Sequence, residues 1–400
     1  SLERIIRPFE RAVHRHATAL PVAWSIFVVA VGLMIGLVSR FPNYTGANAK
    51  FPGSLAAFAG TPYGQAITWW LEHPFQRVPT ETLFPEAVRG QALIAGAMSH
   101  CDKLAFRAFL PLVNQVFAGG GWTLVFANHL AVLLTFFLIY RLCLRITTDA
   151  VLASVAVWAY AAGWAGCWGC NDWVFGDAVA VGLLLGAMAT RRSGLTSVLV
   201  VFAGFVDERA IFAAPLVALF RTWESQPPFA ASTVRLDFRR GWVASAPVVV
   251  GLAVYAALRY LAAWWFNLAA GTSMMANADI LLYHFYVSYP IKLFGVFEFL
   301  WVAPLLLLLH SGVSGVAGRY TLPAFVLALL IAAAPAFLVW DVDRSLGYLL
   351  PGIVASICFL PITSKKYMPP VTLLPSCAYQ PLSRYMPPTA CHLGKAMRSS

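Results

Sequence analysis

The segment Leu195–Phe220, LTSVLVVFAGFVDERAIFAAPLVALF, consists of two short apolar runs joined by Asp207, Glu208 and Arg209. Charged side chains beside hydrocarbon are costly, so in membrane proteins they are usually paired, face a cavity or serve a function. We therefore expect a helical hairpin with these three charged residues at its tip. Because both arms are short, the tip should lie below the membrane surface, within a cavity.

The rest of the chain is equally apolar. Of its 400 residues, 60% are hydrophobic and 11% are charged, and the mean hydropathy is +0.72. A soluble domain is about 25% charged, so the composition predicts an all-α polytopic membrane protein. The net charge of +11 does not indicate nucleic acid, because the basic residues fall in short clusters between apolar runs, where orientation signals lie.

The apolar runs predict about ten transmembrane helices, with short re-entrant or interfacial helices between some of them. The predicted parts are a cytoplasmic amphipathic helix at 1–18, a transmembrane domain at 19–362 with long outer loops at about 39–103 and 260–290, and an irregular cytoplasmic tail at 363–400. This assignment places 18 of the 28 Lys and Arg residues on the inner side, which favours cytoplasmic termini. The topology and composition indicate a bacterial inner membrane.

Four segments carry more detailed expectations. Gly64–His73 is predicted to form an interfacial helix, and Leu104–Phe117 is too short to span, so it is predicted to be a half-helix or re-entrant segment. Val151–Ala165 and Ile291–Leu309 are each predicted to span as one helix.

Polar residues gather at the predicted outer ends of these helices. The set comprises Asp102, Asp172, Asp177, Asp207, Glu208, Asp279, Asp341 and Asp343, with Arg107, Arg209, Arg344, His100 and His284. Carboxylates in such a cavity suit a general base or a divalent ion such as Mg²⁺ or Mn²⁺, and arginines suit phosphate. The alternative is that the acids and arginines form internal salt bridges that close the helix ends. For Glu208 with Arg209 and for Asp343 with Arg344, we weigh the two interpretations equally.

Other chemical signatures are sparse. The sequence contains no P-loop, no His-Glu-x-x-His and no zinc-ligand spacing, so no metal ligands are assigned. Cys167 and Cys170 form a lone CxxC that would suit a disulfide or half of a metal site, although two free thiols are the favoured interpretation.

A family resemblance rests on three features. A first span is followed by a long outer loop, Phe106–Pro111 contains an Arg-x-x-x-Pro pattern, and Asp207, Glu208 and Arg209 precede an apolar run with Pro215. Together they resemble polytopic bacterial membrane proteins related to the C-type (GT-C) glycosyltransferases. That family uses polyprenyl-phosphate-linked sugar donors at the outer membrane face. It usually has an acidic catalytic residue early in the first outer loop, whereas Arg40–Gly53 contains no Asp or Glu.

The resemblance implies a polyprenyl-phosphate-dependent glycosyltransferase in which Asp207 or Asp172, with Glu208 as a further candidate, is the general base. The remaining candidates would hold the substrate, and these are Arg209, Arg107, Arg344, Asp341, Asp343 and His284. In place of the missing early acid, Glu72, Glu81 and Glu86 are the first acidic candidates in the loop.

Two other functions stay open. One is a non-catalytic structural or scaffold subunit of a larger membrane complex, which the missing early acid and the Trp-rich outer surface suit. The other is a transporter. Expected partners are therefore membrane lipids, a polyprenyl-phosphate sugar or other membrane subunits, and not nucleic acid.

Overall fold

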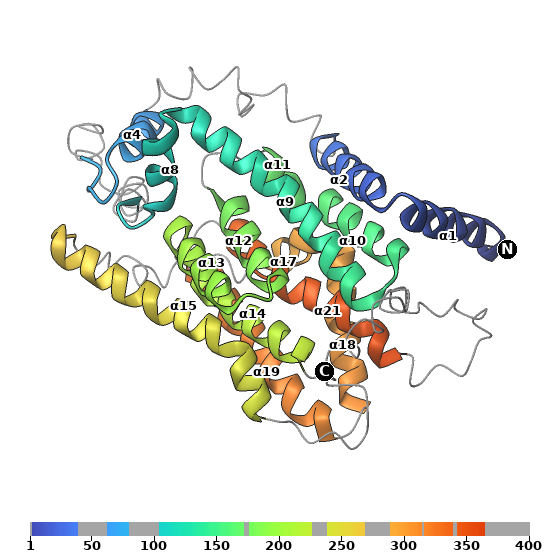
Figure 1. Ribbon diagram of the computed structural model, residues 1–400. Coiled ribbons are helices and arrows are strands. Elements are labelled where there is room, and N and C mark those ends of the chain that lie inside the picture. The colour runs from blue at the N-terminus through green and yellow to red at the C-terminus, as the bar shows by residue number, and fades with distance from the viewer. Residues whose placement is uncertain are drawn as a thin grey trace, which may run out of the picture. The chain divides into compact units, whose positions relative to one another are not determined.

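The computed structural model describes residues 2–38, 62–79, 104–171, 176–225, 238–268, 289–313, 316–338 and 342–364. Throughout these ranges the backbone forms helices, turns and irregular segments and contains no strand (Figure 1). The all-α prediction is therefore confirmed. Residues 1–364 form one compact unit, which is the unit described below. Most of the predicted tail at 363–400 lies outside the described residues.

The helices of the first unit are, in chain order, α1 (Leu2–Ala19), α2 (Pro21–Val38), α4 (Pro62–Glu72), α8 (Phe109–Phe117), α9 (Gly121–Thr147), α10 (Ala150–Ala162), α11 (Trp164–Asn171), α12 (Asp177–Ala189), α13 (Ser193–Val206), α14 (Arg209–Ser225), α15 (Phe238–Trp265), α17 (Tyr289–Phe297), η4 (Glu298–Trp301), α18 (Val302–Val313), α19 (Val316–Ala333), η5 (Ala334–Leu338), α20 (Val342–Gly347) and α21 (Leu350–Ser364). The labels η4 and η5 denote 3₁₀ helices.

Several of these helices could cross a membrane. Within the described ranges, three are long and apolar enough, namely α2, α9 and most of α15, and the broken pair of α10 and α11 makes up to four. Five shorter apolar helical stretches accompany them. In the apolar core of a bilayer only helices and closed barrels satisfy the backbone, so these apolar helices are compatible with a multi-pass membrane protein.

Helix α12 lies in the middle of the bundle. It packs between α9 and α13, and both arms of the predicted hairpin, α13 and α14, also contact α15 (Figure 1). The hairpin has its expected form, with Asp207 and Glu208 between the two arms. Ser197 in α13 donates to the carbonyl oxygen of Pro247 at 2.7 Å, and Tyr255 packs against Gly204. This register leaves the last seven or so residues of α15 beyond the hairpin tip, about 10 Å at 1.5 Å per residue.

Two arginines close the opposite end of the bundle. Nη1 of Arg145 donates to the carbonyl oxygen of Ala189 at 2.6 Å, and Nη1 of Arg221 donates to that of Thr190 at 2.7 Å. The last carbonyls of a helix have no partner within it, so these guanidiniums cap the C-terminal end of α12.

Helices α4 and α8 form a small cap that does not span. Asn114 in α8 donates to the carbonyl oxygen of Leu71 at 3.2 Å, and Gln115 donates to that of Glu72 at 2.9 Å. Helix α8 also contacts α9 and α13. Both segments contain short helices, as expected, and their interfacial or re-entrant placement stays a prediction.

Two predicted single spans are broken. The first bends by 73° at Gly163, between α10 and α11. The second is interrupted at Glu298, which has φ +47° and is the first residue of η4, directly after the end of α17. Cys167, just after the first break, donates its thiol to the carbonyl oxygen of Ala161 at 3.3 Å. Both Cys167 and Cys170 are free thiols.

The first break generates a prediction about Gly166. A Cβ there would meet the carbonyl oxygen of Tyr160 in hard contact and Cα of Ala161 at 2.7 Å. Both are backbone atoms that cannot move aside without disturbing the break. We expect Gly166→Ala to lower the free energy of unfolding by about 1–3 kcal/mol, measured by denaturant titration in detergent.

Gly194→Ala is the matched control, because a Cβ at Gly194 meets no atom within 4 Å. It should leave stability unchanged or raise it slightly, since alanine favours helix. Equal stability of the two variants would contradict the tight packing at the break.

Candidate functional site

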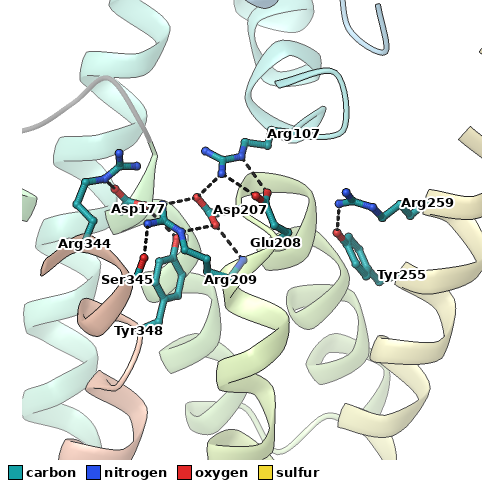
Figure 2. Close-up of polar contacts among 10 residues, drawn as sticks. All are labelled: Arg107, Asp177, Asp207, Glu208, Arg209, Tyr255, Arg259, Arg344, Ser345 and Tyr348. Carbon is teal, nitrogen blue, oxygen red and sulfur yellow. Dashed lines mark hydrogen bonds and ion pairs between the residues drawn. The ribbon is translucent and has the colours of Figure 1, made fainter. Parts of the chain in front are cut away.

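The tip of the α13–α14 hairpin is the centre of a buried cluster of charged side chains (Figure 2). Asp207 ends α13 and is fully buried. Its Oδ1 accepts from the backbone N–H of Arg209 at 2.9 Å, which fixes the turn into α14, and from Nε of the same residue at 2.9 Å. Its Oδ2 lies 2.7 Å from Nη2 of Arg209 and 3.1 Å from Nη2 of Arg107.

Glu208 forms a two-pronged ion pair with Arg107. Nε and Nη2 of the guanidinium each donate to a carboxylate oxygen at 3.0 Å, a geometry that strengthens and orients the pair. Arg107 precedes α8 and reaches the hairpin tip from the cap (Figure 2). The Arg-x-x-x-Pro pattern and the Asp-Glu-Arg pattern therefore meet in space.

Asp177, in the first turn of α12, binds Arg209 and a third arginine, Arg344. Nη2 of Arg209 lies 2.7 Å from its Oδ1, and Nε of Arg344 lies 2.6 Å from its Oδ2. The hydroxyl of Tyr348 donates to Oδ1 at 3.1 Å. Nη1 of Arg209 binds the Ser345 hydroxyl at 3.1 Å. These contacts join α12, α14 and the segment around α20 at one end of the bundle.

The cluster is balanced in charge. Its three carboxylates face three guanidiniums, and all six side chains are at most 13% exposed. Burial alone would raise the pKa of Asp207, but Arg107 and Arg209 hold that pKa well below its usual range. Burial likewise opposes ionisation of Glu208, and Arg107 holds its pKa below the usual value. Both carboxylates are therefore ionised and held by their partners.

This arrangement limits what the cluster can do chemically. An efficient general base has a pKa near the working pH and reaches the proton that it removes. Asp207 and Glu208 have lowered pKa values and are already bonded to guanidiniums. In this state they are poor general bases, and their ion pairs hold the hairpin tip to the neighbouring segments.

A further cation, Arg259, lies beside the cluster. Nη1 donates to the Tyr255 hydroxyl at 2.7 Å. The guanidinium carbon is 4.3 Å from the centroid of the Phe106 ring, a cation–π contact next to Arg107 in the chain. Arg259 thus holds α15 against the residues that lead into the cap.

The structure brings together four of the predicted site residues with Glu208, namely Asp207, Arg209, Arg107 and Arg344. Other predicted residues lie outside the described ranges, and these are Asp172, Asp341 and His284, with Asp102, Asp279 and His100. The backbone of Asp343 belongs to α20, but its side chain is not among those described. No role for these residues follows from the structure.

The sequence-based site lacked three residues that matter to the geometry. The sequence places Asp177 on the outer face but favours Asp172 as the functional acid. Asp177 directly follows Gly176 at the start of a helix, and this position is a signal for a functional acid because carboxylates are favourable at helix N-termini. Ser345 and Tyr348 carried no signal in the sequence, because only the fold brings them to the cluster.

Among the described residues, no group of three or more His, Cys, Asp or Glu side chains is placed to hold a metal ion. A requirement for Mg²⁺ or Mn²⁺ stays a prediction.

No protein-family model matches the chain, and comparison with curated proteins and with solved structures finds no match. The resemblance to the C-type glycosyltransferases thus stays a prediction that rests on the residues quoted for it.

Removal of one carboxylate tests how much the buried ion pairs contribute to stability. Asp207→Asn leaves Arg107 and Arg209 buried with one fewer negative charge, so the free energy of unfolding should fall by about 3–5 kcal/mol. The measurement is denaturant unfolding in detergent. The control is Glu10→Gln, on the exposed surface of α1, which should change stability by less than about 0.5 kcal/mol. Equal unfolding curves for the two variants would show that the cluster carries no stability.

The same ion pairs give stability a defined pH dependence. Unfolded Asp and Glu have pKa values of about 3.9 and 4.3, and the folded pKa values of Asp207 and Glu208 are lower. Their contribution is therefore complete above about pH 5 and is lost as the pH falls through the folded pKa values. We expect the unfolding midpoint to decline below about pH 4, and to decline less in Asp207→Asn. A midpoint that rises on acidification would contradict the assignment.

Proposed function

We propose that the chain is a multi-pass protein of about ten spans in a bacterial inner membrane, with both termini in the cytoplasm. The four candidate spans, the five shorter apolar stretches and α14 together supply ten crossings. Arg145 and Arg221, with Arg191 and Arg192 beside them, occupy the end opposite the charged cluster. Positive residues favour the cytoplasmic side, which supports an outward-facing cluster.

Helix α15 supports this placement. Trp242 and Trp264 lie near its two ends and are 63% and 71% exposed. They are 22 positions apart, which corresponds to about 33 Å of helix, close to the thickness of the hydrocarbon core, which is about 30 Å. Tryptophan is enriched at both membrane interfaces, so the two side chains fit aromatic belts at opposite surfaces.

We infer that the protein is a non-catalytic structural subunit of a larger membrane complex. The observation that carries this inference is that Asp177, Asp207 and Glu208 are all buried and all engaged by arginines of the same chain. The cluster joins the cap, α12, the hairpin and α20, and it offers no unpaired carboxylate for proton transfer. Its chemistry suits holding one face of the protein in a fixed shape.

A lipid-linked glycosyltransferase is the second candidate, and two observations favour it. Nη1 of Arg107 is buried and has no hydrogen-bond partner among the described residues, so it retains donors for a phosphate oxygen. Glu72 is exposed at the end of α4, and its carbonyl oxygen accepts from Gln115 in α8, the helix that follows this arginine. It is the earliest described acid in the predicted first outer loop, although it lies downstream of the early position at which the resembled family has its catalytic residue.

The transporter hypothesis stays a prediction. A broken span such as α10–α11 is a feature of many transporter sites. The cavity beside this break, described below, has room for only one or two water molecules.

Gentle detergent extraction followed by native mass spectrometry separates the first two candidates. We expect a stable complex with other membrane proteins in a fixed ratio, without a bound prenyl-phosphate-sized molecule, and unchanged by Glu72→Gln. Glu10→Gln serves as the control for the loss of one exposed carboxylate. A lone chain that carries a prenyl-phosphate-sized adduct would overturn the structural assignment. Loss of sugar transfer to lipid-linked acceptors in Glu72→Gln membranes, with normal protein levels, would establish the second candidate instead.

A further inference from the structure

A small cavity lies between α9, the break that joins α10 to α11, α12 and the residues around α20. Its volume is about 30 Å³, which is enough for one or two water molecules and too little for a lipid or sugar. Asp177, Arg344 and Tyr348 line one side (labelled in Figure 2), so the cavity borders the charged cluster. Trp164 and Thr135 are also part of the wall.

Two buried polar atoms on α9 have no hydrogen-bond partner among the described residues. They are Oγ1 of Thr135 and Oδ1 of Asn128, whose side chains are 3% and 1% exposed. Thr135 lines the cavity directly. Asn128 lies two turns earlier on α9, and its amide nitrogen donates to the carbonyl oxygen of Gly169, another lining residue, at 2.8 Å.

Buried polar atoms of this kind need a hydrogen-bond partner. A buried polar group without a hydrogen bond costs about 1–3 kcal/mol, and ordered water is the usual partner where protein atoms supply none. The helix break supplies the space, because the chain turns away at Gly163 and the wall there contains Ala165, Gly166 and Gly169. Irregular backbone at membrane depth is tolerated where it is buried in protein or lines a water-filled cavity.

We propose that this cavity is a hydration site that binds one or two ordered water molecules, held by the Thr135 hydroxyl and by the Asp177 and Tyr348 side of the charged cluster. A buried water typically makes about three hydrogen bonds, and these three side chains provide acceptors and donors around one small volume. An ionic ligand does not fit the site, because Asp177 and Arg344 already neutralise each other at 2.6 Å.

The test is a pair of substitutions at Thr135 in the full-length protein. Thr135→Val keeps the shape and removes the hydroxyl, whereas Thr135→Ser keeps the hydroxyl. If water binds there, Thr135→Val takes away one of its partners, and the thermal unfolding midpoint should fall by about 1–3 °C. If the cavity is dry, Thr135→Val removes an unsatisfied polar atom and the midpoint should rise above that of the wild type.

Density maps at about 2 Å from the wild-type, Thr135→Ser and Thr135→Val proteins provide the second measurement. The proposal expects one or two water peaks in the wild-type cavity, retained in Thr135→Ser and lost or weakened in Thr135→Val. An empty wild-type cavity, a higher midpoint in Thr135→Val, or a continuous feature larger than two waters would each overturn it. The last result would identify a ligand site of a different kind.

Discussion

The ion pairs between buried arginines and carboxylates are the constraint on which one end of this protein depends. Removing charges from water is expensive, and the cost is offset only when geometry and additional hydrogen bonds satisfy both partners. Here residues from four parts of the chain supply the ion pairs and most of the hydrogen bonds, although Nη1 of Arg107 has no partner among the described residues. The contacts tie the helix ends to one another. The carboxylate of Asp207 has two roles, because it fixes the hairpin turn and also binds arginines from the hairpin and from the cap.

Arginines stabilise the two ends of the bundle through different interactions. At one end, the guanidiniums of Arg145 and Arg221 bind helix carbonyls, which are partial negative charges. At the other end, full charges neutralise one another away from solvent. The first arrangement needs only a nearby helix terminus, whereas the second needs each partner in place. A single lost residue therefore affects the clustered end more severely.

The sequence predicts which end of the bundle the charged residues occupy better than it predicts which of them pair. The alternation of apolar runs correctly predicted an all-helical chain and brought Arg107, Asp207 and Arg344 to one end, because successive helices in a bundle run in opposite directions. The pairing of Asp177 with two arginines depends on how α12 packs beside α14 and α20, and no local pattern encodes it. The sequence did not predict the breaks at Gly163 and Glu298, because each is a single residue inside an otherwise apolar run and a lone glycine or acid does not by itself mark a helix break.

The separation of the paired residues along the chain has a consequence for biosynthesis. Asp177 and Arg344 are 167 residues apart, and Arg107 and Glu208 are 101 apart. At about 5–20 residues per second, the ribosome completes Arg344 roughly 10–30 s after Asp177. During that interval Asp177 has Arg209 as a partner but lacks Arg344, and Arg107 lacks both of its carboxylates until Asp207 and Glu208 are made. If the chain inserts into a membrane as proposed, these charges would need a polar environment, such as the aqueous interior of an insertion channel, until their partners emerge.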